Sequence, residues 1–148
     1  MPKKSGPVSE KHEVPTSTHF EVMLAADIKT ISPVVTWVMF LAREMKYAAG
    51  KEFEIEMALR EALANAVLHG CNSDPSKRIE CSVTSEEERG ILIVVSDPGN
   101  GFDAAKVPSP THEQNIFSEH GRGIFLINTL MDEVQFERNG AEIHMRKY

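Results

Sequence analysis

The sequence predicts an α+β fold in which helices cover one face of a mostly antiparallel sheet, forming a two-layer sandwich. Apolar residues recur at helical period between residues 55 and 67, which indicates an amphipathic helix. Two strand-like runs follow it, at 78–84 and 90–97. The chain ends in a predicted hairpin over 133–147, turned by Asn139-Gly140. This order of elements, without internal repeats, predicts a single domain.

Before the first helix, the chain changes from an irregular tail to a strand. Residues 1–18 are polar, contain prolines and show no periodicity, so they predict a mobile tail ahead of a domain at 19–148. Residues 19–26 alternate as a strand does, with Phe20, Val22 and Leu24 on one face. Ser32 offers a helix N-cap and Pro33 suits the first turn, so a helix can run from here to Gly50.

This first helix carries more large apolar side chains than one core-facing stripe requires. Its predicted buried stripe consists of Trp37, Val38, Leu41 and Met45. Met39 and Phe40 add further large apolar side chains beside Trp37. Because such a surplus indicates an association surface, we expect a homodimer.

The second helix contains a polar pair at the margin of its apolar stripe. Residues 61–70 read E-A-L-A-N-A-V-L-H-G, which places Glu61 and Asn65 four residues apart and therefore on one helical face. The apolar stripe consists of Ile55, Ala58, Leu59, Ala62, Leu63, Ala66 and Val67. A pocket could open at that margin. The alternative is that Glu61 is a solvated side chain and Asn65 an incidental one.

Two glycine-containing motifs follow. The sequence D-P-G-N-G-F at 97–102 places Asp97 at the end of a buried strand, where a carboxylate could accept hydrogen bonds from a ligand; an ordinary turn is the alternative. Farther on, 121–123 reads G-R-G and precedes an apolar helix at 124–131. A helix that begins there would direct N–H groups and a partial positive charge at a phosphate, with Arg122 as an added cation.

Taken in this order, the motifs resemble the three nucleotide-binding boxes of the GHKL ATP-binding superfamily. The matching residues are Glu61, Asn65, His69 and Gly70, then Asp97, Gly99 and Gly101, then Gly121 and Gly123. The short domain and the T-L-M-D-E-V sequence at 129–134 most resemble bacterial anti-sigma-factor serine/threonine kinases of partner-switching systems. The similarity runs from about His19 to the C-terminus. It implies the histidine-kinase-like ATPase fold, with ATP between the helices and the sheet, and a dimer.

The resemblance implies a role for each polar site residue. Asn65 matches the Mg²⁺ ligand, and one protein oxygen can suffice because Mg²⁺ keeps several waters and binds phosphate oxygens. Glu61 matches the general base that takes a proton from the attacking hydroxyl or water. Asp97 matches the carboxylate that recognises the adenine amino group. Many relatives carry a threonine near the adenine where this chain has Ala141-Glu142.

The glycine boxes would surround the rest of the nucleotide. Gly99 and Gly101 would let the backbone approach the base and ribose, and Gly121, Arg122 and Gly123 would face the phosphates. That Arg122 stabilises transferred charge is an inference from its placement. The residues at 102–122, which show no sustained period, are interpreted as a lid over the phosphates, hinged on Gly101 and Gly121.

The expected function is that of a Mg-ATP-dependent serine/threonine kinase acting as an anti-sigma factor. It would phosphorylate a STAS-domain anti-anti-sigma protein and sequester a sigma factor. The alternative is a nucleotide-gated binding module with little or no kinase activity; Glu61 favours the enzyme, because a binder needs no base. A detached histidine-kinase catalytic domain is less favoured, since no phosphoacceptor helix surrounds His120. His69, near a helix end, is left out of the catalytic residues.

Composition sets limits on partners and location. The 148 residues with 41% apolar content can bury one core, and a formal charge of −6 argues against a nucleic-acid partner. Cys71 and Cys81 have neither metal-ligand spacing nor a disulfide framework, so they are interpreted as reduced thiols. The sequence contains no membrane-spanning run and no signal peptide, so we expect a cytoplasmic protein.

Overall fold

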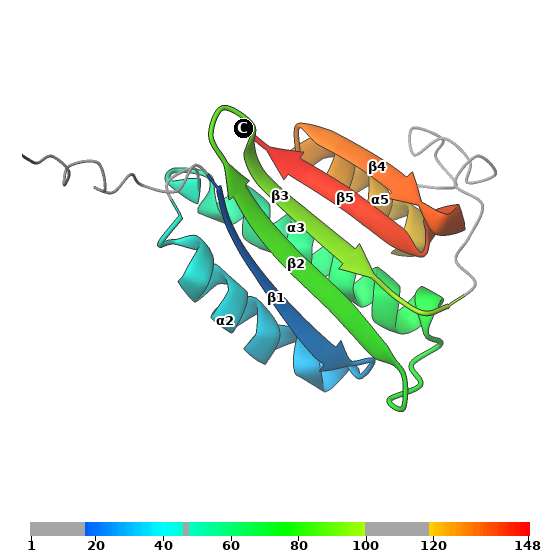
Figure 1. Ribbon diagram of the computed structural model, residues 1–148. Coiled ribbons are helices and arrows are strands. Elements are labelled where there is room, and N and C mark those ends of the chain that lie inside the picture. Colours follow the sequence, from blue (N-terminus) through cyan, green and yellow to red (C-terminus); the bar gives the residue numbers. More distant parts are fainter. Residues whose placement is uncertain (1–16, 46–47, 100–118) are drawn as a thin grey trace, which may run out of the picture.

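The computed structural model describes residues 17–45, 48–99 and 119–148 of the chain. Its main elements, in chain order, are β1 (Ser17–Ala25), α2 (Ile31–Ala42), α3 (Glu52–Asn65), β2 (Arg78–Glu86), β3 (Gly90–Ser96), α5 (Glu119–Leu130), β4 (Glu133–Glu137) and β5 (Glu142–Lys147). Short helical turns are η1 (Ile28–Thr30), η3 (Ala66–Gly70) and η5 (Arg138–Gly140). Figure 1 shows how these elements are arranged.

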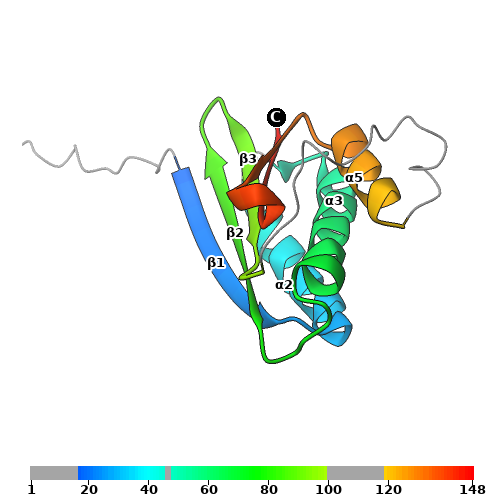
Figure 2. The same ribbon diagram turned by 90° about the vertical axis from the view of Figure 1, so that its right-hand side faces the viewer.

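The five strands form one sheet in the order β1-β2-β3-β5-β4, and every neighbouring pair is antiparallel. The helices α2, α3 and α5 all lie on one face of this sheet, which Figure 2 shows edge-on. The predicted α+β sandwich is therefore confirmed.

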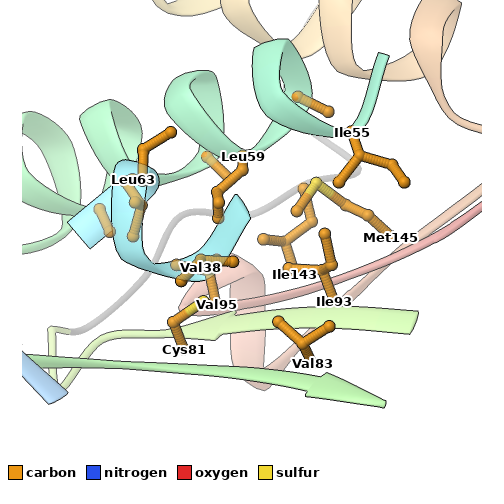
Figure 3. Packing of buried hydrophobic residues seen from close by; sticks show 14 of the residues in the cluster. Val38, Ile55, Leu59, Leu63, Cys81, Val83, Ile93, Val95, Ile143 and Met145 are labelled. Atoms are coloured by element: carbon orange, nitrogen blue, oxygen red, sulfur yellow. The ribbon is translucent and has the colours of Figure 1, made fainter. Parts of the chain in front are cut away.

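The core lies between the helices and the sheet, with α3 packed across the three central strands. The apolar stripe predicted for α3 is buried along its whole length, from Ile55 to Val67. Its larger side chains face the inward residues of the sheet, including Ile93 on β3 and Met145 on β5 (Figure 3). Cys81, predicted as strand core, is 1% exposed, and burial raises the pKa of its thiol to about 12. Alternate residues of β2 and β3 thus fill the core, as a sheet covered on one face requires.

The first helix differs from its prediction. It ends at Ala42 rather than at Gly50, because the next amides fold into tighter turns, with the Met45 N–H donating to Ala42 O at 2.9 Å. Its buried face comprises Ile31, Val35, Val38, Met39 and Ala42. Trp37 was wrongly placed in that stripe: it is 43% exposed, and its ring packs edge-on against Phe20 of β1. Leu41 is half-buried and Met45 is buried. The N-cap is Thr30 rather than the predicted Ser32.

Three further boundaries differ from the predicted ones. The strand β1 begins at Ser17, inside the predicted tail of 1–18. The helix α5 begins at Glu119, so the last part of the predicted lid at 102–122 belongs to this helix, and residues 102–118 lie outside the described residues. The hairpin turn includes Arg138 and Asn139, both with positive φ. Gly140, with a φ of 91°, completes it.

The C-terminal strand contacts the C-terminal end of α5. The Lys147 Nζ atom donates to the Leu130 carbonyl oxygen at 2.7 Å, which places a cation at the C-terminal end of this helix. The following backbone N–H of Tyr148 donates to Asp132 Oδ2 at 2.7 Å. Within the described residues, no helix combines the length and apolar character needed to cross a membrane.

Candidate functional site

A cavity of about 230 Å³ opens where the end of α3 meets the end of β3 and the beginning of β5. Its apolar walls include Ala62, Val95 and Ile143, and its polar groups include Asn65, His69 and Asp97. An apolar hollow with a few converging polar groups is typical of a small-molecule site. The structure therefore brings together two of the predicted site residues, Asn65 and Asp97, which are distant in sequence.

The last turn before the cavity is wider than an ordinary α-helical turn. The helix α3 continues directly into the π-helical turn η3, where the Cys71 N–H donates to Ala66 O, five residues back, at 2.9 Å. Such turns occur often at functional sites. This one carries His69 and Gly70 to the cavity wall.

Asp97 is a buried carboxylate directly after β3. Asp97 is only 6% exposed, and its backbone N–H donates to the Ala141 carbonyl oxygen at 2.9 Å. The Gly99 N–H donates to Asp97 Oδ1 at 2.8 Å. Burial raises the pKa of the Asp97 carboxyl, although this hydrogen bond and the charges of Arg138 and Lys77 act in the opposite direction. Oδ2 can then accept a hydrogen bond from a ligand.

Arg138 supports Asp97 from the β4–β5 turn. Its guanidinium Nη2 donates to the Asp97 carbonyl oxygen at 3.0 Å and to Ser96 Oγ. Its Nε atom donates to Glu142 Oε1 at 3.3 Å. These bonds join the end of β3 to the turn whose Gly140 lines the cavity. Arg138 was not among the predicted site residues, because an arginine in a hairpin turn gives no signal that it reaches another strand.

Gly70 and Gly99 contact the Asp97 region so closely that neither has room for a side chain. A Cβ atom on Gly70 would lie 2.3 Å from Asp97 Oδ2, and one on Gly99 would lie 2.0 Å from the carbonyl oxygen of Gly70. Contact within the protein is therefore enough to require glycine at both positions. The predicted role of Gly99 in approaching the nucleotide stays a prediction.

Replacing Gly70 by alanine should displace the Asp97 carboxylate. The φ of Gly70 is outside the left-handed region, so the effect comes from the added Cβ rather than from backbone strain. We expect unfolding to become easier by about 1–3 kcal/mol, as for other overpacked sites, and ATP affinity to fall about tenfold. Thermal denaturation and titration calorimetry measure the two effects.

The matched control for this prediction is the same change in an Asp97→Ala background. There the added Cβ has no carboxylate to meet, so Gly70→Ala should change stability and affinity little. Equal effects in both backgrounds would show that the contact with Asp97 is not what constrains Gly70.

A groove of about 480 Å³ lies between α3 and α5 and shares Asn65 and His69 with the cavity. Glu61 on α3 and Arg122 and Gly123 on α5 also line it. A Cβ atom on Gly123 would lie 2.9 Å from Glu61 Oε1 and 3.4 Å from Asn65 Oδ1, so glycine permits a close approach of the two helices here. The predicted pair Glu61 and Asn65 thus faces the third glycine motif directly.

The third motif has a different helical context from the one predicted. Because α5 begins at Glu119, Gly121, Arg122 and Gly123 lie in its first turns rather than ahead of it. Gly121 and Gly123 are buried, and Arg122 is exposed on the groove wall. Gly101, from the second motif, lies outside the described residues.

The donor atoms near Asn65 fit a hard, mostly hydrated cation. Among the residues that the structure describes, no group of three or more His, Cys, Asp or Glu side chains could hold a metal ion. A metal here would take one amide oxygen from Asn65 and its other ligands from phosphate and water, which Mg²⁺ accepts. The half-buried Asn65, at the junction of cavity and groove, satisfies that requirement.

The fold is that of a histidine kinase-like ATPase domain, in agreement with the motifs. The chain belongs to the histidine kinase-like ATPase domain family, whose profile matches residues 24–147. The resemblance predicted from the three motifs is therefore confirmed.

Named relatives are similar to the chain over most of its length. Serine-protein kinase RsbW of Bacillus velezensis is 28% identical over 137 residues, covering 88% of this chain and 85% of that protein. Serine-protein kinase RsbW of Bacillus licheniformis is 31% identical over 115 residues, covering 73% and 71%. The Staphylococcus aureus (strain JH9) protein of the same name is 35% identical over 102 residues, covering 64% of each chain.

Proposed function

We propose that this protein is a Mg-ATP-dependent serine/threonine kinase that acts as an anti-sigma factor in the cytoplasm. Its substrate is a STAS-domain anti-anti-sigma protein, and it sequesters a sigma factor while that protein is phosphorylated. The relatives named serine-protein kinase support the reaction class. The STAS partner and the sigma factor follow from the resemblance to partner-switching kinases.

One observation supports the kinase most directly: the separate placement of Glu61 and Asp97. Asp97 lines the cavity, Glu61 lines the groove, and Asn65 lines both. A nucleotide held by its base at Asp97 would thus extend its phosphates toward Asn65, where the groove begins. Glu61, a proton acceptor on the groove side of Asn65, is suitably placed to assist transfer of a phosphoryl group to an incoming hydroxyl.

Each side chain then has one task. Bound Mg-ATP supplies the phosphoryl group and the cation that neutralises charge developing on it. Asp97 Oδ2 would accept a hydrogen bond from the adenine amino group, and Asn65 would hold Mg²⁺ through its amide oxygen. The Glu61 carboxylate takes the proton of the acceptor hydroxyl. Arg122 and the backbone at Gly121 and Gly123 would face the phosphates.

The second candidate is a nucleotide-gated binding module with little or no phosphotransfer. It would use the same cavity and the same Asn65. The position of Glu61 favours the kinase, because a carboxylate beside the phosphates repels them and benefits only a protein that must remove a proton.

The test is phosphotransfer from radiolabelled ATP to candidate STAS proteins from the same genome. The kinase proposal expects label on a serine or threonine of one STAS protein, dependent on Mg²⁺. If ATP binds but label reaches no STAS protein, the binding-module proposal replaces it.

We also propose that the protein is a homodimer, as its relatives' class suggests. Trp37 is 43% exposed and Phe40 is 63% exposed on α2, where a second copy could cover them. Light scattering at tens of micromolar should give twice the mass of the 16.5 kDa chain. A strictly monomeric mass would contradict the dimer and leave the site assignments intact.

A further inference from the structure

The groove between α3 and α5 is larger than the proposed proton transfer needs. Its volume is about 480 Å³, and phosphates beside Asn65, Arg122 and Gly123 would occupy only the part of the groove that those residues line. Glu61 lines this groove and does not line the nucleotide cavity. The group that gives its proton to Glu61 must therefore come from the groove side of Asn65.

Beside the polar residues Glu61, Asn65, His69 and Arg122, one part of the groove wall is apolar. Ala64 on α3 and Leu68 on η3, with Phe125 and Leu126 on α5, form this part of the wall. Phe125 is 40% exposed, whereas Ile124 and Ile127 of the same helix point into the protein and are buried. An attacking water needs no such wall, but a polypeptide segment would bury it against its own apolar side chains.

We propose that the groove binds the acceptor segment of the protein substrate, a stretch of chain that presents its hydroxyl to Glu61 and its neighbouring apolar side chains to Leu68 and Phe125. This inference rests on the proposed kinase function and adds the surface that selects the substrate. Continuity supports it, because the apolar wall begins one helical turn from each of two polar residues. Ala64 follows Glu61 on α3, with Leu68 next on η3, and Phe125 and Leu126 follow Arg122 on α5.

The experiment measures phosphotransfer from Mg-ATP to the STAS protein that the parent protein labels, as a function of STAS concentration. Phe125→Ala and Leu68→Ala should each raise the KM for the STAS protein about tenfold, as truncation of an interface anchor does, and leave the dissociation constant for Mg-ATP unchanged. Phe125→Lys is the second variant, since an exposed position accepts lysine in the fold while a charge blocks an apolar contact.

Phe53→Ala is the matched control, because Phe53 is an even more exposed phenylalanine, at 69%, in the first turn of α3 and outside the groove. It should leave the KM unchanged. Unchanged KM values for the groove variants, or an equal rise for Phe53→Ala, would overturn the proposal.

A binding measurement separates failure of this inference from failure of the kinase proposal. Calorimetry with the STAS protein and the Mg-ADP-bound parent gives its affinity without phosphotransfer. Suppose that the parent binds the STAS protein but transfers no phosphate to it, and that Phe125→Ala weakens this binding. That result would overturn the kinase proposal and retain the groove as the docking site. A parent that binds no STAS protein would overturn both.

Discussion

Replacing Glu61 by glutamine should lower phosphotransfer by about 10²-fold to 10⁴-fold, while ATP binding is kept or slightly tightened because the charge that repels the phosphates is gone. Glutamine keeps the shape of glutamate but accepts no proton at neutral pH. Glu61 lines the groove rather than the cavity, so its charge contributes little to the binding of the adenine base. Single-turnover phosphotransfer and calorimetric titration of ATP measure the two quantities.

Asn65→Ala provides the contrasting variant. Asn65 lines both the cavity and the groove, and its loss should remove the magnesium-dependent part of ATP binding, and turnover with it. Simple unfolding would abolish ATP binding in both variants. ATP binding that Glu61→Gln retains and Asn65→Ala loses would therefore show separate roles for the two residues. If Glu61→Gln labels the STAS protein as fast as the parent, Glu61 is not the base.

Asp97→Asn should weaken ATP binding about 10-fold to 100-fold, the range expected when a hydrogen bond to a charged group is lost. The Gly99 N–H fixes the oxygen at the Oδ1 position, so the asparagine would place its NH₂ group where Oδ2 now lies. The amide NH₂ group of the asparagine and the amino group of adenine, both hydrogen-bond donors, would then face each other. Competition between ATP and inosine triphosphate should also become less selective, because the latter offers an acceptor there.

The same substitution should stabilise the protein without nucleotide at neutral pH. Burial raises the pKa of Asp97 in the folded state, so ionisation of this group opposes folding. The parent therefore loses stability as pH rises from the unfolded-state pKa of Asp97, near 4, through its folded-state pKa. The stability advantage of the Asp97→Asn variant should appear over that pH window and persist above it. Denaturation at pH 3 and pH 7 tests this. An advantage that is larger at pH 3 would contradict it.

The second helix and the placement of Glu61 and Asn65 on it could be predicted because a single pattern determines both. The apolar residues from Ile55 to Val67 repeat at helical period, and Glu61 and Asn65 lie at the margin of that pattern, which is where the structure has the cavity and the groove. The strands β2 and β3 were predictable for the same reason, since alternation shows which side chains face the core.

Other features depend on contacts that sequence periodicity does not contain. The face of α2 is set by how the helix lies on β1, so Trp37 packs against Phe20 at the edge and Val35 takes the buried position. The π-helical turn η3 has no signal of its own, because its residues would also fit a regular helix. Arg138 supports Asp97 across 41 residues of sequence, and only the sheet order brings them together.

The most direct test of the central claim, a nucleotide site between α3 and the end of β3, is titration of the protein with ATP in the presence of magnesium. We expect a single site per chain, weakened by Asp97→Asn at constant magnesium and by magnesium removal in the parent. The absence of any binding at millimolar ATP, which corresponds to about −4 kcal/mol, would contradict the nucleotide site and leave only the fold in common with the family.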